Sequence, residues 1–585
     1  MNKEQMVEAL RLKVLGLRDA GSGVWSGELA SSALGTALAM AVMLDGDADD
    51  VRRAKAGASW LVANINADGG WGDTPESVSN VSATLIARAA LALFARKYTG
   101  GVGAADALAR SEAWITARAG SLEFPFVVKA LEGVYGEDRT FSVPILTFLA
   151  ICDEDDTAWP QIPQLPFLLA LFPHGVFRFF RMQVVSYALP ALIAIGLCRH
   201  IAAAKAQRRL AWGKSFAGVL LKKLGRIQPP HGGFLDAIPL TAFVCLALRR
   251  AGFGHHAVVS KGGEFLRQAA RADGSWAIDS NLRTWVTSLA ARSVLTNTCG
   301  LEKSFYRGER NQVASWLVKA QMRRVHPYTG APPGGWAWTD LPGGVPDADD
   351  TSGALVALRM LRQDGATMEM SRAVRMGLRW LMGLQNADGG VPTFCRGWGK
   401  LPFDRSCADI TAHALLAMAL WPEMVHGMVK SAGRMADYLR AQQAEDGSWC
   451  PLWFGHQEAE GGRNPIIGTA RVVDALVKAH GAGMAGVEEM ALRGTAWLVA
   501  RQRDDGAWGM GRDATLEETA LAVIALAGSG GAQEAVRRGR EWLCAQGLDA
   551  LSRPAPVGLY FALLWYHEKM YPWVWTLEAL GDGGN

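Results

Sequence analysis

The chain has 585 residues, of which 50% are hydrophobic and 20% are charged, the ordinary balance of a globular protein with large cores. Its formal net charge of +4 is small for this length, and it excludes the basic footprint of a general nucleic-acid-binding protein. Eight cysteines are scattered without a C-x-x-C pair. This pattern favours a reduced, cytoplasmic compartment over a disulfide framework.

The first half of the chain has three segments that bear on membranes. Residues 1–23 form a charged amphipathic pattern without the apolar stretch of a signal peptide. The most apolar window, 182–198, is short for a bilayer span and contains Pro190, so we expect a buried core helix. Residues 208–226 mix Trp212 and Phe216 with lysines and arginines, which suits either a membrane interface or an ordinary surface helix.

A degenerate repeat runs through the chain. Its fullest copies read Q-x-x-D-G-x-W and end at Trp449 and Trp508, and from residue 276 onward the last position recurs every 55 to 60 residues. Helical spacing of apolar residues precedes and follows each copy, and the alternation typical of strands is missing. The repeat therefore predicts an all-α protein of two-helix units joined by glycine-rich turns, stacked as a solenoid or closed as a barrel.

Two acidic clusters share the pattern D-x-D-D-T, at 153–157 and at 347–351. Trp159 and three prolines follow the first, so no helix follows it directly, and we interpret it as a solvated acidic loop. An aromatic P-G-G segment precedes the second and an apolar run follows it. Asp350 or Thr351 could cap the helix that this run predicts.

A histidine lies in the segment "CADITAH", 407–413. Asp409 and His413 are four residues apart and would share one face of a helix. By residue type, Cys407, Asp409 and His413 could also ligate zinc.

The repeats, the P-D-x-D-D-T motif and the D-x-T-A-H segment together resemble the squalene–hopene cyclases, the class II (protonation-initiated) triterpene cyclases. The resemblance covers nearly the whole chain, from Trp25 to Pro572. It implies two α/α barrels (α6/α6 toroids) with QW-type turns and a large apolar cavity between them. The first barrel would span 26–290, and the second would combine an N-terminal helix, 1–25, with 291–585.

The resemblance also implies the residues of an active site. Protonating an unactivated C=C bond needs a strong acid in a dry site, which neighbouring carboxylates with different environments can supply. Asp349 would be the proton donor, Asp347 and Asp350 its partners, His413 its hydrogen-bonding histidine and Asp409 a companion carboxylate. Aromatic faces would stabilise the carbocations. The residues expected to face the substrate are Trp285, Trp338, Phe394, Trp449 and Tyr566.

The implied activity is that of an isomerase or lyase that cyclises a linear isoprenoid, with squalene as the expected substrate, and that uses no metal or cofactor. The resemblance further implies a cytoplasmic protein in peripheral, monotopic contact with the inner face of the cell membrane, and it is compatible with a homodimer. Four positions depart from the family by lacking its aromatic residues, which leaves the ring count and the substrate open. These positions are Ile467, Ala555, Leu559 and Leu563.

Other interpretations stay open. A class II cyclase of a shorter isoprenoid diphosphate would need a basic pocket, and the sequence shows no unmistakable motif for one. A zinc prenyltransferase subunit would use residues 407–413 but leaves 347–350 unexplained. A magnesium-dependent class I synthase would read D-D-x-x-D, and no second metal motif stands out. A non-catalytic, lipid-binding repeat protein fits the degenerate repeats but not the acid cluster with its histidine.

Overall fold

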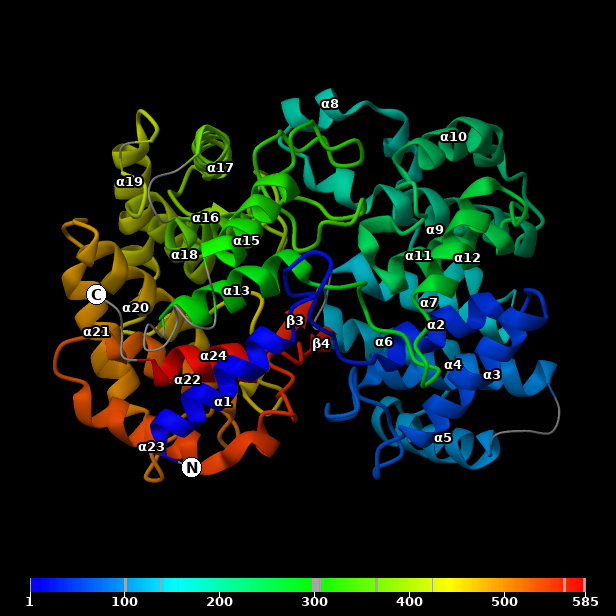
Figure 1. The fold of residues 1–585 in the computed structure, drawn as a ribbon. Coiled ribbons are helices and arrows are strands. Elements are labelled where there is room, and N and C mark those ends of the chain that lie inside the picture. Colours follow the sequence, from blue (N-terminus) through cyan, green and yellow to red (C-terminus); the bar gives the residue numbers. More distant parts are fainter. Residues whose placement is uncertain are drawn as a thin grey trace.

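The computed structural model describes residues 2–98, 103–136, 138–154, 156–296, 305, 307–362, 367–422, 424–560 and 564–581. These residues form two helical bodies that lie side by side (Figure 1). The helices of the first body are α2 (Ala33–Met43), α3 (Ala48–Ala63), α4 (Val81–Lys97), α5 (Ala104–Ala119), α6 (Phe124–Tyr135), α7 (Arg139–Asp153), α8 (His174–Phe179), α9 (Val184–Ala206), α10 (Ala217–Ile227), α11 (Ile238–Arg250) and α12 (Ala257–Gln268). Its 3₁₀ helices are η1 (Trp159–Gln161), η2 (Phe167–Leu171), η3 (Trp212–Phe216) and η4 (Phe234–Asp236).

The second body takes the rest of the chain together with the N-terminal helix. Its helices are α1 (Lys3–Gly16), α13 (Arg283–Thr296), α15 (Arg307–Ala320), α16 (Ala348–Leu361), α17 (Met368–Leu384), α18 (Ala408–Ala419), α19 (Met428–Gln442), η5 (Glu460–Gly462), α20 (Pro465–Gly481), α21 (Glu488–Ala500), α22 (Leu516–Ala527), α23 (Gln533–Ala550) and α24 (Tyr571–Leu580). Two short antiparallel hairpins complete it. They are β1 (Val391–Pro392) with β2 (Ser406–Cys407), and β3 (Gly558–Tyr560) with β4 (Leu564–Tyr566).

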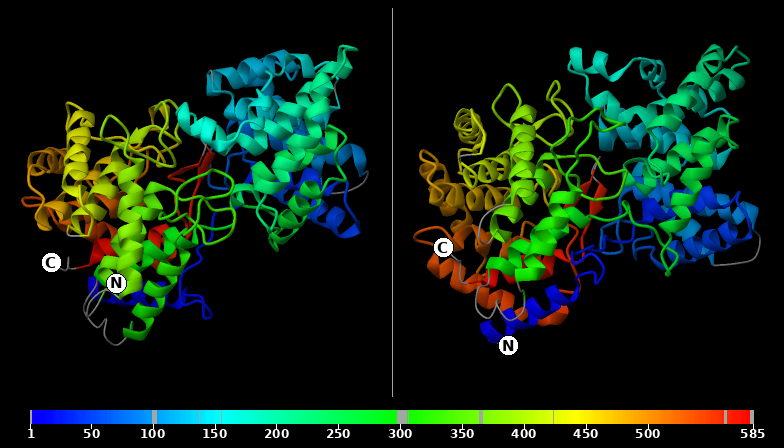
Figure 2. Two further views of the ribbon diagram at one scale, coloured as in Figure 1. Left: turned by 90° about the horizontal axis from the view of Figure 1, so that it is seen from above. Right: turned by 45° about the horizontal axis from the view of Figure 1, so that its top comes forward.

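The second body is a closed α/α barrel. Its inner helices α13, α16, α18, α20, α22 and α24 pack one against the next, and α24 returns to α13. Outer helices α15, α17, α19, α21 and α23, together with α1, cover this ring. The inner helices are apolar on almost every face because they are enclosed on all sides; in α18, for example, ten of twelve residues are buried. The predicted all-α toroid fold is confirmed, and Figure 2 shows both bodies from two further directions.

The first body closes with fewer inner helices. Among its described residues, α2, α4, α7, α9 and α11 form the inner ring, and α11 returns to α2. Helices α3, α5, α6, α10 and α12 lie outside. The ring thus has five inner helices instead of the predicted six, because residues 159–179 form short 3₁₀ helices and α8 where a further inner and outer pair would stand.

The repeat turns are held by the residues that recur in their own pattern. The Gln443 side-chain amide donates to the carbonyl of Gly447 at 2.9 Å and to that of Met490, in the next outer helix, at 3.1 Å. The indole N–H of Trp449 donates to Leu439 at 2.9 Å. Gly447 has a φ of 98°, and a β-carbon there would stand 2.8 Å from the Arg493 carbonyl, so glycine is required. Each turn therefore fastens one unit to the next.

The border between the bodies lies earlier than residue 290. That residue falls inside α13, whose partners α1, α15, α16 and α24 all belong to the second barrel. Helix α1 packs against α13, α23 and α24 and lies beside them in Figure 1. A helix cannot be divided between two rings, so the second barrel begins no later than Arg283.

One helix among the described residues is long and apolar enough to cross a membrane by length and composition. It is α9, and 61% of its most apolar window is buried inside the protein. It packs against α7, α10 and α11, which places the apolar window predicted at 182–198 in the core of the first body.

Candidate active site

The acid motif begins an inner helix of the second barrel. Asp347 caps α16 by accepting the Asp350 backbone N–H at 2.8 Å, as a short polar side chain does at a helix start. The Ala348 N–H donates to the carbonyl of Thr393 at 2.8 Å, which ties the motif to the segment that follows β1. Asp347 and Asp350 are buried, whereas the Asp349 side chain keeps 15% of its exposure. Asp349 is therefore the carboxyl group that a bound molecule can touch.

Two further inner helices supply partners for Asp349. His413 on α18 places its Nδ1 2.7 Å from Asp349 Oδ1. Arg471 on α20 donates from Nη2 to both Asp349 oxygens, at 2.7 and 2.8 Å. Its Nη1 donates to Asp409 Oδ2 at 2.7 Å. The predicted residues Asp347, Asp349, Asp350, Asp409 and His413 are thus brought together, with Asp409 linked to Asp349 through Arg471.

The three carboxyl groups of the motif have opposite tendencies to hold a proton. Burial opposes ionisation of Asp349, but the charge of Arg471 and the hydrogen bond with His413 outweigh it and keep the pKa of Asp349 well below its usual range. Burial and the charge of Asp349 raise the pKa of Asp347 to about 7. Burial and the charge of Asp347 raise the pKa of Asp350 well above its usual range. Asp347 and Asp350 therefore favour the protonated form, whereas Asp349 favours the carboxylate and is a strong acid when it is protonated.

Two of the predicted aromatic residues lie beside this cluster. The ring of Trp285 meets the His413 ring edge-on at 6.3 Å between centroids, and the Arg471 guanidinium lies 5.9 Å from it. Tyr566 is in hydrogen-bonding range of Tyr571 at 3.4 Å. Burial raises the pKa of Tyr566, and the charges of Asp350 and Asp349 contribute to the shift. Both side chains thus stand where a cation formed near Asp349 would meet a π face.

Two further predicted aromatic residues, Trp338 and Phe394, belong to a second group. Phe394 contacts Trp338 edge-on at 6.2 Å between centroids, and its ring also packs on Tyr187 at 5.5 Å. Phe403 and Trp453 pack on the same ring. Trp338 donates to the buried carboxylate of Asp279 at 3.4 Å. The sequence did not single out Tyr187 or Phe403, because one comes from the first body and the other from a loop without a motif.

Trp449 has a different role from the one expected. It is buried in its repeat turn, with its backbone N–H bonded to Thr469 and its indole to Leu439. Trp508 makes the same pair of contacts in the following turn, to Thr519 and Leu498. Trp449 therefore holds two repeat units together instead of facing a substrate.

The residues that suggested zinc do not converge. The Cys407 thiol donates to Asp409 Oδ1 at 2.6 Å, Asp409 is paired with Arg471, and His413 is bonded to Asp349. Within the described ranges, no group of three or more His, Cys, Asp or Glu side chains is arranged to hold a metal ion.

The first acidic cluster lies apart from this site, in the first body. Asp153 and Glu154 are exposed at the end of α7, and Asp156 pairs with Arg250 at 2.6 Å and Lys205 at 3.8 Å. Asp155 lies outside the described residues. The partners of Asp156 are surface cations, which is the arrangement of a solvated acidic loop.

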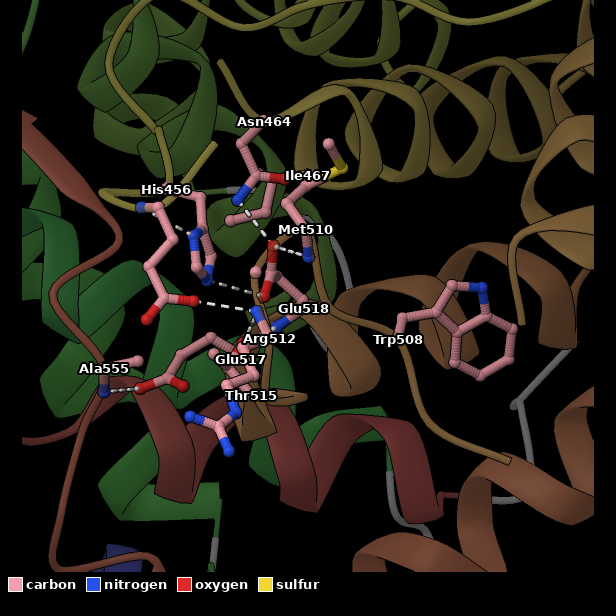
Figure 3. A network of polar contacts seen from close by, with 12 residues as sticks. His456, Asn464, Ile467, Trp508, Met510, Arg512, Thr515, Glu517, Glu518 and Ala555 are labelled. Carbon is pink, nitrogen blue, oxygen red and sulfur yellow. Dashed lines mark hydrogen bonds and ion pairs between the residues drawn. The ribbon is translucent and has the colours of Figure 1, made fainter. Parts of the chain in front are cut away.

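A second buried polar network supports the helix that carries Arg471 (Figure 3). Glu518 of α22 accepts the Asn464 side-chain amide at 2.8 Å and the Met510 N–H at 3.1 Å. Asn464 in turn caps α20 through the Ile467 N–H at 3.1 Å. The neighbouring Glu517 accepts the Ala555 N–H at 2.8 Å. The start of α20 is thus fixed from α22, and the position of Arg471 follows from it.

We expect Glu517→Gln to reduce the loss of stability at alkaline pH. Burial raises the pKa of Glu517 to about 8, although the hydrogen bond from Ala555 opposes the rise. The folded state binds this proton more tightly than the unfolded state, so the stabilisation is complete below about pH 4.5 and is lost as pH rises through about 8. A pKa that is higher by one in the folded than in the unfolded state adds ~1.4 kcal/mol to the unfolding free energy.

The measurement is Tm from pH 5 to 9 for the wild type, Glu517→Gln and the exposed control Glu445→Gln. The amide keeps the acceptor for Ala555 but cannot ionise, so its Tm should fall less steeply with pH than that of the wild type. Equal slopes for wild type and Glu517→Gln would show that Glu517 is not protonated in the folded state.

The fold and the site have the features expected of the class II terpene cyclases that the sequence resembles: a double α/α toroid with a D-x-D-D cluster, a histidine and aromatic side chains at one end of an inner ring. The family model of the squalene-hopene cyclase C-terminal domain matches residues 282–551, and that of the prenyltransferase alpha-alpha toroid domain matches residues 12–126. In these two regions the chain is similar to the squalene–hopene cyclase family.

Several relatives are similar to parts of the chain or to most of it. The squalene–hopene cyclase of Bradyrhizobium diazoefficiens is 29% identical over 45% of this chain and 42% of its own length. The enfumafungin synthase of Hormonema carpetanum is 25% identical over 89% of this chain and 43% of its own length. The copalyl diphosphate synthase of Streptomyces cyslabdanicus is 25% identical over 80% of this chain and 76% of its own length.

Among solved structures, ent-copalyl diphosphate synthase from Streptomyces platensis has the same fold, with a TM-score of 0.58 and 19% identity over 100% of both chains. The chain spans less than half the length of the first curated relatives that it matches, from 24% to 43%.

Proposed function

We propose that this protein protonates the terminal alkene of a linear isoprenoid at Asp349 and guides its cationic cyclisation. The Asp349 O–H bond breaks as the alkene π pair takes the proton, and the carboxylate that forms is stabilised by Arg471 and His413. The final carbocation gives up one proton to water, and Asp349 regains one proton from solvent, so that the reaction consumes no net proton. The observation that supports this function most is the accessible carboxyl of Asp349 between a guanidinium, a histidine and Trp285.

Two substrate classes fit this chemistry. Squalene is the substrate expected from the resemblance. A prenyl diphosphate, cyclised to a bicyclic diphosphate, is the second candidate. It is favoured by the copalyl diphosphate synthase relative, whose similarity covers 76% of its own length, against 42% for the squalene–hopene cyclase of Bradyrhizobium.

The test is product formation by the purified protein from squalene in detergent and, separately, from geranylgeranyl diphosphate. Both reactions would be run with and without EDTA and analysed by gas chromatography–mass spectrometry, after dephosphorylation of the diphosphate products. Cyclic product from either substrate in EDTA supports acid-initiated cyclisation. Turnover that requires added magnesium and releases diphosphate would contradict it.

We further propose peripheral contact with the inner face of the cell membrane through an apolar surface patch of the first body. Its residues are exposed side chains of η2, α8, η3, α10 and the adjoining loops: Leu171, Phe172, Phe179, Phe180, Leu210, Trp212, Phe216 and Val219. Helices α8 and α10 lie along the same upper edge of the molecule in Figure 1. Lysines and arginines between these residues suit an anionic lipid surface.

We expect the double variant Phe179→Ser/Phe180→Ser to bind anionic vesicles at least about 10-fold more weakly than the wild type, because two exposed aromatic side chains lose apolar contact. Co-sedimentation with phosphatidylcholine–phosphatidylglycerol vesicles measures this. Val429→Ser is the matched control, since Val429 is 85% exposed on the second barrel and Phe179 is 81% exposed. Equal loss of binding in the control would contradict the assignment of the patch.

A further inference from the structure

A pocket of about 980 Å³ opens between the two bodies. The segment from α8 to α9 forms one side, and α17 with the loops at 329–333 and 394–399 forms the other. Part of its wall is apolar and includes Tyr187, Trp380, Leu384 and Phe394. Phe394 also belongs to the aromatic group described above, so the pocket reaches the residues expected to face the substrate.

Four arginines line this pocket: Arg178, Arg181, Arg379 and Arg396. All four are exposed, and none forms an ion pair with a carboxylate of the described residues. The Arg178 guanidinium donates to the Gly330 carbonyl at 3.1 Å. Asp388 also lines the pocket, but its Oδ1 accepts the Gly390 N–H at 3.0 Å and the Ser406 hydroxyl at 2.9 Å. The pocket thus gathers positive charge that the protein does not neutralise.

A guanidinium group can donate two parallel hydrogen bonds to two oxygens of one phosphate group, and it stays charged at any physiological pH. Four of these groups around one opening form a site for an anion with several oxygens. A pure hydrocarbon would leave them without a partner, so the pocket selects a molecule with a charged end.

Packed residues connect the wall of the pocket to the acid motif. Phe394 packs on Trp338, and the residue before it, Thr393, accepts the Ala348 N–H inside the acid motif at 2.8 Å. In a linear isoprenoid with a charged head, the alkene that is protonated lies at the opposite end from the head. A chain that enters tail first would bring that alkene toward Asp349 while its head stays among the arginines.

We infer that this pocket binds the diphosphate head of the substrate, so that the natural substrate is a prenyl diphosphate and not squalene. This inference rests on the proposed function, because it assumes that the acid at Asp349 starts the reaction. The same phosphate chemistry could come from a phospholipid head group at the membrane, and the experiment distinguishes the two sources.

The first arm measures binding without turnover. Inorganic pyrophosphate is titrated by calorimetry into the wild type, Arg379→Gln/Arg396→Gln and Arg372→Gln/Arg375→Gln. Arg372 and Arg375 are exposed on the same helix as Arg379 but do not line the pocket. We expect saturable binding in the wild type and the control, and at least about 10-fold weaker binding in the pocket variant, as two charged hydrogen-bonding groups are lost.

The second arm measures turnover. With geranylgeranyl diphosphate, the pocket variant should raise KM at least about 10-fold with little change in kcat, and pyrophosphate should inhibit the wild type competitively. Cyclisation of squalene with a higher kcat/KM than the diphosphate, without inhibition by pyrophosphate, would overturn the inference and leave the proposed function intact. Pyrophosphate binding at the arginines without turnover of either substrate supports the anion site but contradicts the proposed function.

The third arm tests the lipid source. Vesicles of phosphatidylcholine alone and with phosphatidylglycerol are offered to the wild type and the pocket variant. Absence of pyrophosphate binding, together with loss of anionic vesicle binding in the pocket variant, would assign the arginines to lipid and overturn the inference. Unchanged vesicle binding in that variant supports a substrate site.

Discussion

Replacing Asp349 by asparagine is expected to lower the turnover number by roughly 100- to 10,000-fold, the range that a general acid contributes. Asparagine keeps the size of the side chain and can still accept a hydrogen bond from Arg471, but it has no acidic proton to give to an alkene. Asp347 and Asp350 are buried, and the charge of Asp347 raises the pKa of Asp350. Neither carboxyl group can therefore replace Asp349 as the acid that touches the substrate. KM should change little, because binding of the apolar chain does not depend on this proton.

The measurement is single-turnover kinetics of the wild type, Asp349→Asn, Asp350→Asn and the control Asp156→Asn. Asp156 belongs to the other acidic cluster and is paired with surface cations, so its variant should keep full activity. Thermal unfolding of each variant reports whether lost activity reflects lost folding. A larger defect in Asp350→Asn than in Asp349→Asn would show that the proton reaches the substrate from another member of the cluster.

Much of the fold could be predicted because the repeat encodes it locally. Glutamine, glycine and tryptophan at fixed spacing make the turn bonds seen at Gln443 and Trp449, and these need only residues close in sequence and the next helix. The number of inner helices in the first barrel could not be predicted in the same way. Residues 159–179 carry no repeat turn, and their 3₁₀ helices depend on packing within the first body.

The acid cluster could be predicted for a similar reason, since Asp347, Asp349 and Asp350 share one helix start and His413 follows Asp409 by one helical turn. Arg471 was missed because its contacts reach 122 residues back to Asp349 and 62 to Asp409. The available signal was a single arginine in the otherwise apolar start of α20, since a buried charge requires a partner. Trp449 was misassigned because tryptophan occurs both in the repeat turns and among the residues expected to face the substrate, so residue type alone does not separate the two roles.

Replacing Arg471 by glutamine is expected to lower the turnover number by roughly 100-fold or more, the usual cost of removing one preorganised group that stabilises developing charge. When the proton leaves for the alkene, the acid cluster becomes one charge more negative, and Arg471 is the cation in direct contact with Asp349 and Asp409. The cluster must also hold its proton to act. Loss of the cation raises the pKa of its carboxyl groups, so the alkaline limb of the pH–rate profile should move to a pH that is higher by about 1–3.

Arg292→Gln separates this electrostatic role from a merely structural one. Arg292, on the inner helix α13, is held at 2.6 Å by Asp474 of α20 and at 2.6 Å by Glu578 of α24. Removing either arginine takes a cation away from two buried carboxylates, although Asp474 keeps Lys478 at 2.6 Å and Asp349 keeps His413 at 2.7 Å. The expected loss of unfolding free energy is therefore below the roughly 3–5 kcal/mol of a fully unpaired buried charge. Both variants should therefore lose stability, but only Arg471→Gln should move the alkaline limb, and Arg471→Lys should move it less. A loss of activity in Arg471→Gln with an unmoved pH profile would reduce Arg471 to a support of the fold, because a cation that tunes the acid cannot be removed without changing where the cluster titrates.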